Sequence, residues 1–130
     1  MKRKCSQRGF TLVEIMIVAA IIALLAAIAV PGFLRARKRS QATRVLEDLR
    51  LLEAAVSLYA IEKSKPSGVT LIFSDLQPYL KTGSALYNTG RDIFGRRYRN
   101  LIVDQFPQMS NRTKTALSDV ADSTFWSPYQ

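Results

Sequence analysis

The sequence predicts an α+β chain: one long N-terminal helix, apolar in its first half, that carries a small globular head with an antiparallel sheet. Three observations lead to this fold class. Residues 15–30 contain no polar side chain. Residues 41–62 repeat apolar side chains at the spacing of one helix face. Beyond Lys63, glycine and proline divide the chain into short segments, which is typical of a small domain of turns and strands.

The apolar segment spans residues 10–34, and its only polar side chains are those of Thr11 and Glu14. It is long enough to cross a bilayer, because a spanning helix needs about 20 apolar residues. A carboxylate inside such a helix costs free energy, although less near an end than at the centre. A chain that keeps Glu14 there is expected to have a use for it.

Charge and composition limit the chemistry of the chain. The formal net charge is +9, and a basic leader precedes Gly9, with a second basic cluster at residues 35–39. We interpret the leader as a topogenic signal and the cluster as a solvated helix face. Contact of the cluster with lipid headgroups, or with DNA in an uptake filament, is the alternative, and nucleic acid is not an expected partner. Because both regions are basic, charge alone does not fix the orientation in a membrane.

The residue inventory argues against an enzyme. The chain has no histidine, and its one cysteine, Cys5, lies in the leader. The commonest general base and the usual thiolate and imidazole metal ligands are therefore missing. No catalytic residue and no cofactor are predicted.

Two general kinds of targeting segment could explain the N-terminal sequence. In a conventional secretory signal, Ala27-Ile28-Ala29 would be the cleavage site, but the apolar run is longer than the about 7–15 residues of such signals. In an uncleaved signal anchor, Thr11 and Glu14 would form a capping box at the helix start. The anchor explains the carboxylate but not the short basic leader that ends at Gly9.

A third explanation is a family resemblance. A short basic leader ending in glycine, then Phe-Thr-Leu-Val-Glu, an apolar run and a proline resembles the class III signal of type IV pilins and type II secretion pseudopilins. The resemblance implies that a prepilin peptidase cleaves after Gly9 and methylates the new amine of Phe10. It also implies an assembly role for Glu14, whose carboxylate would pair with that amine on a neighbouring subunit and set the helical register.

The resemblance divides the chain into four parts: the leader at residues 1–9, the membrane and assembly half of the helix at 10–34, its amphipathic half at 35–63, and the head at 64–130. Pro31 and Gly32 interrupt helical hydrogen bonding or loosen the backbone. They would either end the helix at the membrane surface or kink one continuous helix, as in the family.

Within the second half of the helix, an apolar stripe is expected to pack on the head's sheet. It comprises Ala42, Val45, Leu46, Leu49, Leu52, Val56 and Tyr59. In the head we expect a Ser74/Gln77-capped short helix, an irregular loop over residues 81–90, a strand over 97–103, a turn at Phe106-Pro107 and a helix over 113–121. The aromatic tail at residues 125–129 is expected to dock on the core.

One head segment resembles the Asp-Pro-Trp/Phe-Gly-x-x-Tyr stretch of pseudopilins of the major type. Here it includes Asp92, Phe94, Gly95 and Tyr98, with Ile93 in place of the proline. Gly95 would support a tight turn, and the two aromatic rings can pack on the helix stripe. The family's calcium site is represented only by Asp119 and Asp122, which are weak candidate ligands without a recognisable loop.

These observations predict a structural subunit of a type II secretion pseudopilus or a related type IV filament. Implied partners are the prepilin peptidase, further copies of the chain, other pseudopilins, an inner-membrane platform protein and an assembly ATPase. The N-terminus would be cytoplasmic and the head periplasmic, with one pass through the bacterial inner membrane. A type IV pilus or competence pilin, and a membrane-anchored enzyme or DNA-binding protein with an uncleaved anchor, stay open as alternatives.

Overall fold

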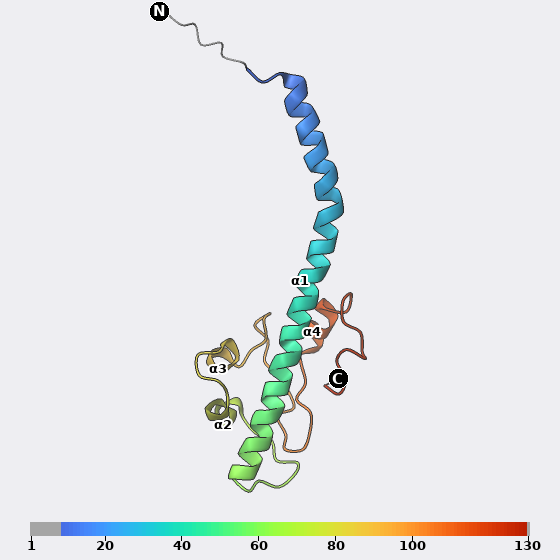
Figure 1. Cartoon of the computed structure of the whole chain (residues 1–130). Helices are drawn as coiled ribbons and strands as arrows, with labels where there is room; N and C mark the ends of the chain where they lie inside the picture. Colours follow the sequence, from blue (N-terminus) through green and yellow to red (C-terminus); the bar gives the residue numbers. More distant parts are fainter. Residues whose placement is uncertain (1–8, 130) are drawn as a thin grey trace, which may run out of the picture. The chain divides into compact units, whose positions relative to one another are not determined.

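The computed structural model describes residues 9–129, so all but the last residue of the expected leader lies outside the described residues. Its elements are α1 (Leu12–Glu62), α2 (Phe73–Leu76), the 3₁₀ helix η1 (Gln77–Tyr79), α3 (Ala85–Thr89) and α4 (Asn111–Ala116). They form two compact units, one ending at Ala36 and the other beginning at Arg37. The single long helix predicted from the sequence is therefore confirmed (Figure 1).

Helix α1 has a defined signal at each end. At its start, Thr11 and Glu14 form the expected capping box. At its end, Ser64 takes a left-handed conformation with φ of 48°, and the N–H groups of Ser64 and Lys65 donate to the carbonyls of Ile61 and Ala60. This pair of bonds is a Schellman motif, which satisfies carbonyl groups that the last turn leaves without helical partners.

Helix α1 continues without interruption through Pro31 and Gly32. The interpretation in which this pair ends the helix at the membrane surface is therefore wrong. Proline has no N–H, so the helix lacks one backbone hydrogen bond at this place, and a glycine follows immediately. The kink that the family resemblance implies stays a prediction.

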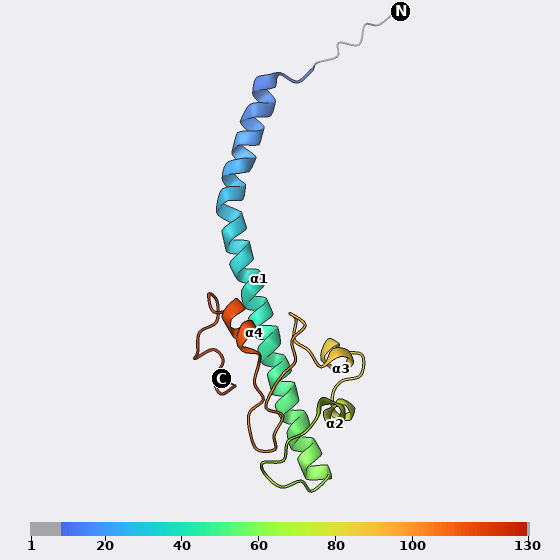
Figure 2. The same cartoon turned by 180° about the vertical axis from the view of Figure 1, so that it is seen from behind.

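The core of the second unit is built on α1. Six of its residues are buried: Ala42, Val45, Leu49, Leu52, Ala55 and Val56. They include five of the seven residues of the predicted stripe, and Leu46 and Tyr59 pack at its edge. In Figures 1 and 2, α2 and α3 lie on one side of this part of α1, and α4 with the C-terminal segment lies on another.

The described head contains isolated antiparallel bridges but no named strand, so the expected sheet is not confirmed. The bridges join Thr70 with Ile102, Arg91 with Arg97, and Arg99 with Gln108. Between residues 97 and 104 the backbone turns to positive φ twice, at Asn100 (59°) and Asp104 (63°). Such residues interrupt the extended conformation that a ladder needs. The predicted strand over residues 97–103 is therefore not confirmed in this structure.

The short helices also differ from their predictions. Helix α2 begins after Ile72, whose N–H donates to the carboxylate of Asp75, so the proposed Ser74/Gln77 cap is wrong. The side chain of Gln77 instead donates to the Tyr87 carbonyl. The predicted helix over 113–121 is α4, which starts two residues earlier and stops at Ala116. Thr113 and Leu117 are buried, whereas Ala116 is exposed.

Helix α3 lies in the loop that was expected to be irregular. Its start is capped by the Ser84 hydroxyl, which accepts from the Tyr87 N–H, and its end by Gly90 in the left-handed conformation. A serine before and a glycine after a short segment are the signals that could have predicted it.

The aromatic tail docks on the core as predicted. Trp126 is fully buried, Tyr129 is 5 % exposed, and Phe125 stacks edge-to-face on Trp126 with ring centroids 4.9 Å apart. Phe106 makes a similar contact with Tyr129. Within residues 9–129, the indole N–H of Trp126 is the one buried side-chain nitrogen or oxygen without a hydrogen-bond partner.

Three head tyrosines hold carboxylates of α1. Tyr98 donates its hydroxyl to Asp48 at 2.8 Å, and Tyr129 and Tyr79 donate to Glu53 and Glu62. They come from three segments far apart in sequence, so each bond ties another part of the head to the same helix.

Burial shifts the ionisation of these partners. It raises the pKa of the half-buried Asp48 carboxyl, and the bond from Tyr98 opposes that shift. Burial, and then the charge of Asp48, raise the pKa of Tyr98 far above its ordinary value. Burial and the bond to Glu53 raise the pKa of Tyr129 to about 12. Both phenols therefore stay protonated in the folded head to a higher pH than a free phenol does.

We expect Tyr98→Phe to lower the free energy of unfolding of the head by about 1–3 kcal/mol at pH 7, because Asp48 loses the donor that compensates its burial. A phenol whose pKa is raised on folding contributes stability that is present below its unfolded pKa of about 10 and lost as the pH rises above it. Above pH 10 the free energy of unfolding should therefore fall less steeply with pH in the variant than in the parent. The two slopes should differ by up to about 1.4 kcal/mol per pH unit.

The measurement is urea unfolding of the full chain in detergent micelles, followed through the fluorescence of the single tryptophan, Trp126. Tyr87→Phe is the matched control, since the Tyr87 hydroxyl makes no hydrogen bond within the described residues. Equal stabilities of the Tyr98 and Tyr87 variants at pH 7 would contradict the role given to the Tyr98–Asp48 bond.

Candidate functional site

The candidate assembly site is the start of α1. Glu14 lies in the first turn, and its atom Oε2 accepts two hydrogen bonds from Thr11, from the backbone N–H at 2.8 Å and from the hydroxyl at 2.9 Å. The Thr11 hydroxyl in turn accepts from the Glu14 N–H at 3.3 Å. Both bonds to the carboxylate end on the same oxygen. The second oxygen, Oε1, makes no hydrogen bond within residues 9–129.

The sequence forms this arrangement for local reasons. A threonine before the helix and a glutamate three residues later exchange hydrogen bonds, which satisfies N–H groups that the first turn leaves without helical partners. The carboxylate also lies at the positive end of the helix dipole. The box therefore holds the Glu14 side chain at the helix start, beside Phe10.

The surface around this carboxylate is apolar and uncovered. Phe10 is 85 % exposed, and every residue from Thr11 to Leu34 is exposed. Within the described residues, α1 is the one helix that is long and apolar enough to cross a membrane. Water is a poor solvent for so long an apolar surface, so lipid or other apolar helices are its natural surroundings.

The processing residues predicted from the sequence are adjacent to this site. Gly9 and Phe10 precede the helix in an exposed, non-helical segment, and a Cβ built on Gly9 would meet nothing within 4 Å. An accessible extended segment is the form in which a peptidase can bind a chain. The structure places Gly9, Phe10 and Glu14 together in the first unit, with Pro31 and Gly32 further along the same helix.

In the head, Asp92 organises the predicted turn. Its atom Oδ1 accepts from the N–H groups of Phe94 and Arg96, while Thr113 donates its hydroxyl to Oδ2. Gly95 has φ of 76°, a conformation that favours glycine. Asp92 is buried and fully bonded, so it joins the turn to the start of α4.

The two aromatic residues of this segment behave differently. Tyr98 is buried against α1, as predicted. Phe94 is 40 % exposed, so its expected packing on the helix stripe is wrong. It lies inside the tight turn between Asp92 and Gly95, where the N–H of Gly95 donates to the Asp92 carbonyl.

The two calcium candidates line one open pocket of the head, but each carboxylate already has a partner within the chain. Asp119 forms an ion pair with Lys38 at 2.7 Å. Asp122 accepts from the Thr124 hydroxyl and the Phe125 N–H, and these bonds lower the pKa of its carboxyl. No group of three histidine, cysteine, aspartate or glutamate side chains that could hold a metal ion occurs within residues 9–129.

Comparison with known proteins adds the following findings. The family described as the prokaryotic N-terminal methylation motif matches residues 4–30. Type II secretion system core protein G of Klebsiella michiganensis is 38 % identical over 63 residues, which are 48 % of this chain and 44 % of the relative. No solved structure matches.

Pilins give similar matches. The type IV major pilin protein PilA of Myxococcus xanthus is 45 % identical over 60 residues, 46 % of this chain and 27 % of the relative. Fimbrial protein Q of Moraxella bovis is 46 % identical over 61 residues, 47 % of this chain and 39 % of the relative. This chain thus spans less than half the length of these relatives. Its resemblance to type IV pilins and type II secretion pseudopilins is confirmed, with the methylation motif at residues 4–30.

Proposed function

We propose that this chain is a structural subunit of a type II secretion pseudopilus or a related type IV filament. A prepilin peptidase removes residues 1–9 and methylates the amine of Phe10. Residues 10–34 then hold the subunit in the membrane and later in the filament, residues 35–63 form the amphipathic half of the helix, and residues 64–130 form the head. The observation that carries the proposal is the Glu14 carboxylate at the start of an exposed apolar segment, within the match to the N-terminal methylation motif.

The geometry of Glu14 supports a double role for its carboxylate. Oε2 caps the helix of its own chain through Thr11, and Oε1 is left for another donor. A carboxylate surrounded by apolar helices is costly unless a cation compensates it. The positive amine of Phe10 on a neighbouring subunit supplies that cation, and capping and pairing then operate at the same time on different oxygens.

This pairing would set the register of assembly. The apolar flanks of the helix give little positional information, since apolar surface attracts without direction. A charge pair that is costly to separate in an apolar environment favours one position of each incoming helix against the last. Pro31 and Gly32 would let the helix kink as it leaves the membrane and packs.

The antiparallel pairing in the head supports the sheet that we propose for it. The Leu71 N–H donates to the Leu101 carbonyl at 2.7 Å, and the Val103 N–H donates to the Val69 carbonyl at 3.0 Å. Arg99 and Gln108 exchange both backbone bonds. These pairs have the register of a small antiparallel sheet interrupted by Asn100.

The proposal includes location and partners. The chain would cross the bacterial inner membrane once, with its N-terminus in the cytoplasm and its head in the periplasm, before it enters an envelope filament. Its partners would be the peptidase, further copies, other pseudopilins, an inner-membrane platform protein and an assembly ATPase.

A type IV pilus or competence pilin is the second candidate function, because the pilins match at 45 and 46 % identity and the secretion protein at 38 %. We expect deletion of the gene to abolish export of secreted proteins while twitching motility and DNA uptake persist. The three assays are run on one deletion strain, with the gene restored in trans as the control. Retained secretion with lost motility would assign the chain to a pilus.

We expect the mature chain to begin with N-methylated Phe10. Mass spectrometry of the protein from membranes checks the terminus, and Gly9→Val should leave the full leader in place because a side chain there crowds the peptidase site. Leu12→Val, at the third residue after the expected cut, is the control and should be processed normally. A chain beginning at Met1 would favour the uncleaved anchor, and one beginning after Ala29 a secretory signal.

Glu14→Gln should be processed like the parent but assemble at least about tenfold less, because removing a buried charge pair worth 1.4 kcal/mol or more changes an equilibrium by that factor. The measurement is the ratio of sheared filament to membrane-bound subunit, with the mature terminus checked by mass. Glu47→Gln, exposed in the second half of α1, is the matched control. Normal incorporation of the Glu14 variant would remove the register argument.

A further inference from the structure

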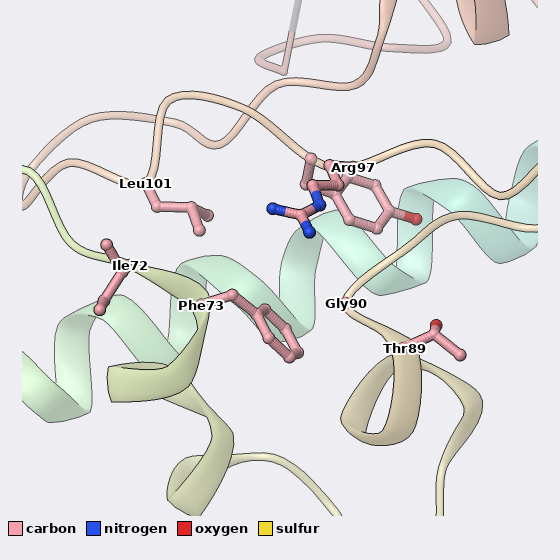
Figure 3. A pocket seen from close by; sticks show the side chains of 7 residues that line it. Ile72, Phe73, Thr89, Gly90, Arg97 and Leu101 are labelled. Carbon is pink, nitrogen blue, oxygen red and sulfur yellow. The ribbon is translucent and has the colours of Figure 1, made fainter.

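The head contains a half-open pocket of about 290 Å³. It lies between the start of α2, the end of α3 and the segment that follows Gly95. Its lining residues are Ile72, Phe73, Thr89, Gly90, Arg97, Tyr98 and Leu101 (Figure 3). None of them belongs to the candidate assembly site at the start of α1.

Backbone bonds and one close contact fix the walls of this pocket. The Leu71 N–H donates a hydrogen bond to the Leu101 carbonyl, and this bond holds the chain before α2 beside the segment that follows Gly95. On the other side, a Cβ at Gly90 would come within 2.8 Å of the Phe73 ring, so a larger residue would displace that ring. The left-handed φ of 60° at Gly90 adds to the requirement for glycine. The pocket is therefore a defined feature of the head.

The pocket combines apolar walls with one cation. Figure 3 shows the guanidinium of Arg97 reaching toward the space between Leu101 and Phe73. Neither ion pair found within residues 9–129 involves Arg97, and its side chain makes no hydrogen bond there. A guanidinium is a planar donor suited to a carboxylate, and beside apolar surface its pairing is stronger than in open water.

We propose that this pocket binds a peptide segment of a partner protein in which an apolar side chain neighbours a carboxylate. The apolar side chain fills the space between Ile72, Phe73 and Leu101, and the carboxylate pairs with Arg97. A volume of about 290 Å³ is large enough for an apolar side chain together with a neighbouring carboxylate, and the open mouth lets the rest of the peptide continue across the surface.

The charge around the pocket favours an acidic peptide. Arg91 lies opposite Arg97 in an antiparallel bridge, and therefore on the same face. Arg97 and Arg99 are exposed, whereas Tyr98 between them is buried, so these two arginines also share a face. Three arginines on one face attract negatively charged partners and disfavour basic ones. Inorganic phosphate would leave the apolar walls uncovered.

The test uses the full chain in lipid nanodiscs, labelled at isoleucine and leucine methyl groups for NMR. The probes are two tetrapeptides with blocked ends, Gly-Leu-Asp-Gly and Gly-Leu-Asn-Gly, which differ only in the carboxylate. We expect the aspartate peptide to shift the methyl signals of Ile72 and Leu101 and to bind about tenfold more tightly than the asparagine peptide.

Two variants separate the pocket from the surface charge. Arg97→Gln should reduce the affinity for the aspartate peptide to that for the asparagine peptide, whereas Arg99→Gln, on the same face but outside the pocket lining, should change it by no more than about twofold. Unchanged Trp126 fluorescence checks that each variant is folded. Equal affinity for the two peptides, or no effect of Arg97→Gln, would overturn the proposal.

Two further probes test the class of ligand. Octanoate and inorganic phosphate are titrated against the same methyl signals. Tighter binding of octanoate than of the aspartate peptide would overturn the peptide assignment in favour of a fatty acid, and tighter binding of phosphate would do so in favour of a phosphate group. Because the readout is the head's own pocket, the result is independent of processing and of assembly through Glu14.

Discussion

Burial of one face of α1 is the constraint on which the head depends. The described head has only short helices and isolated bridges, so no sheet supplies a core of its own. The stripe that includes Val45, Leu49 and Leu52 provides that surface, and the aromatic tail closes over it with Trp126. At about 25 cal/mol per Å² of apolar area, this contact is the main favourable term that so small a domain possesses.

Hydrogen bonds then fix the position of the head along α1. Apolar burial alone would let the head slide along the helix, whereas a tyrosine hydroxyl bonds to a carboxylate in only one position. Asp48, Glu53 and Glu62 lie along α1, and Tyr98, Tyr129 and Tyr79 reach them from separate head segments. The same logic recurs in the proposed filament, where apolar helices attract one another and Glu14 specifies their register.

Capping signals in the sequence predicted a helix end well where the two residues meet within one turn. They predicted it poorly where other residues of the head compete for the same groups. The Thr11 and Glu14 box forms as expected because its two residues meet within one helical turn. The Ser74 cap does not form, because Asp75 bonds to the Ile72 N–H and Gln77 reaches Tyr87 instead. Helix α3 had adequate signals in Ser84 and Gly90 but is too short for periodicity to reveal it.

The sequence by itself determined the long helix, its apolar half, the inward stripe and the hexapeptide at Gly9 to Glu14, because helical period and composition are properties of neighbouring residues. Only the tertiary structure decided that Asp92 bonds to Thr113 and that Arg97 lines a partly apolar pocket. These facts depend on residues far apart in sequence, which no local pattern encodes.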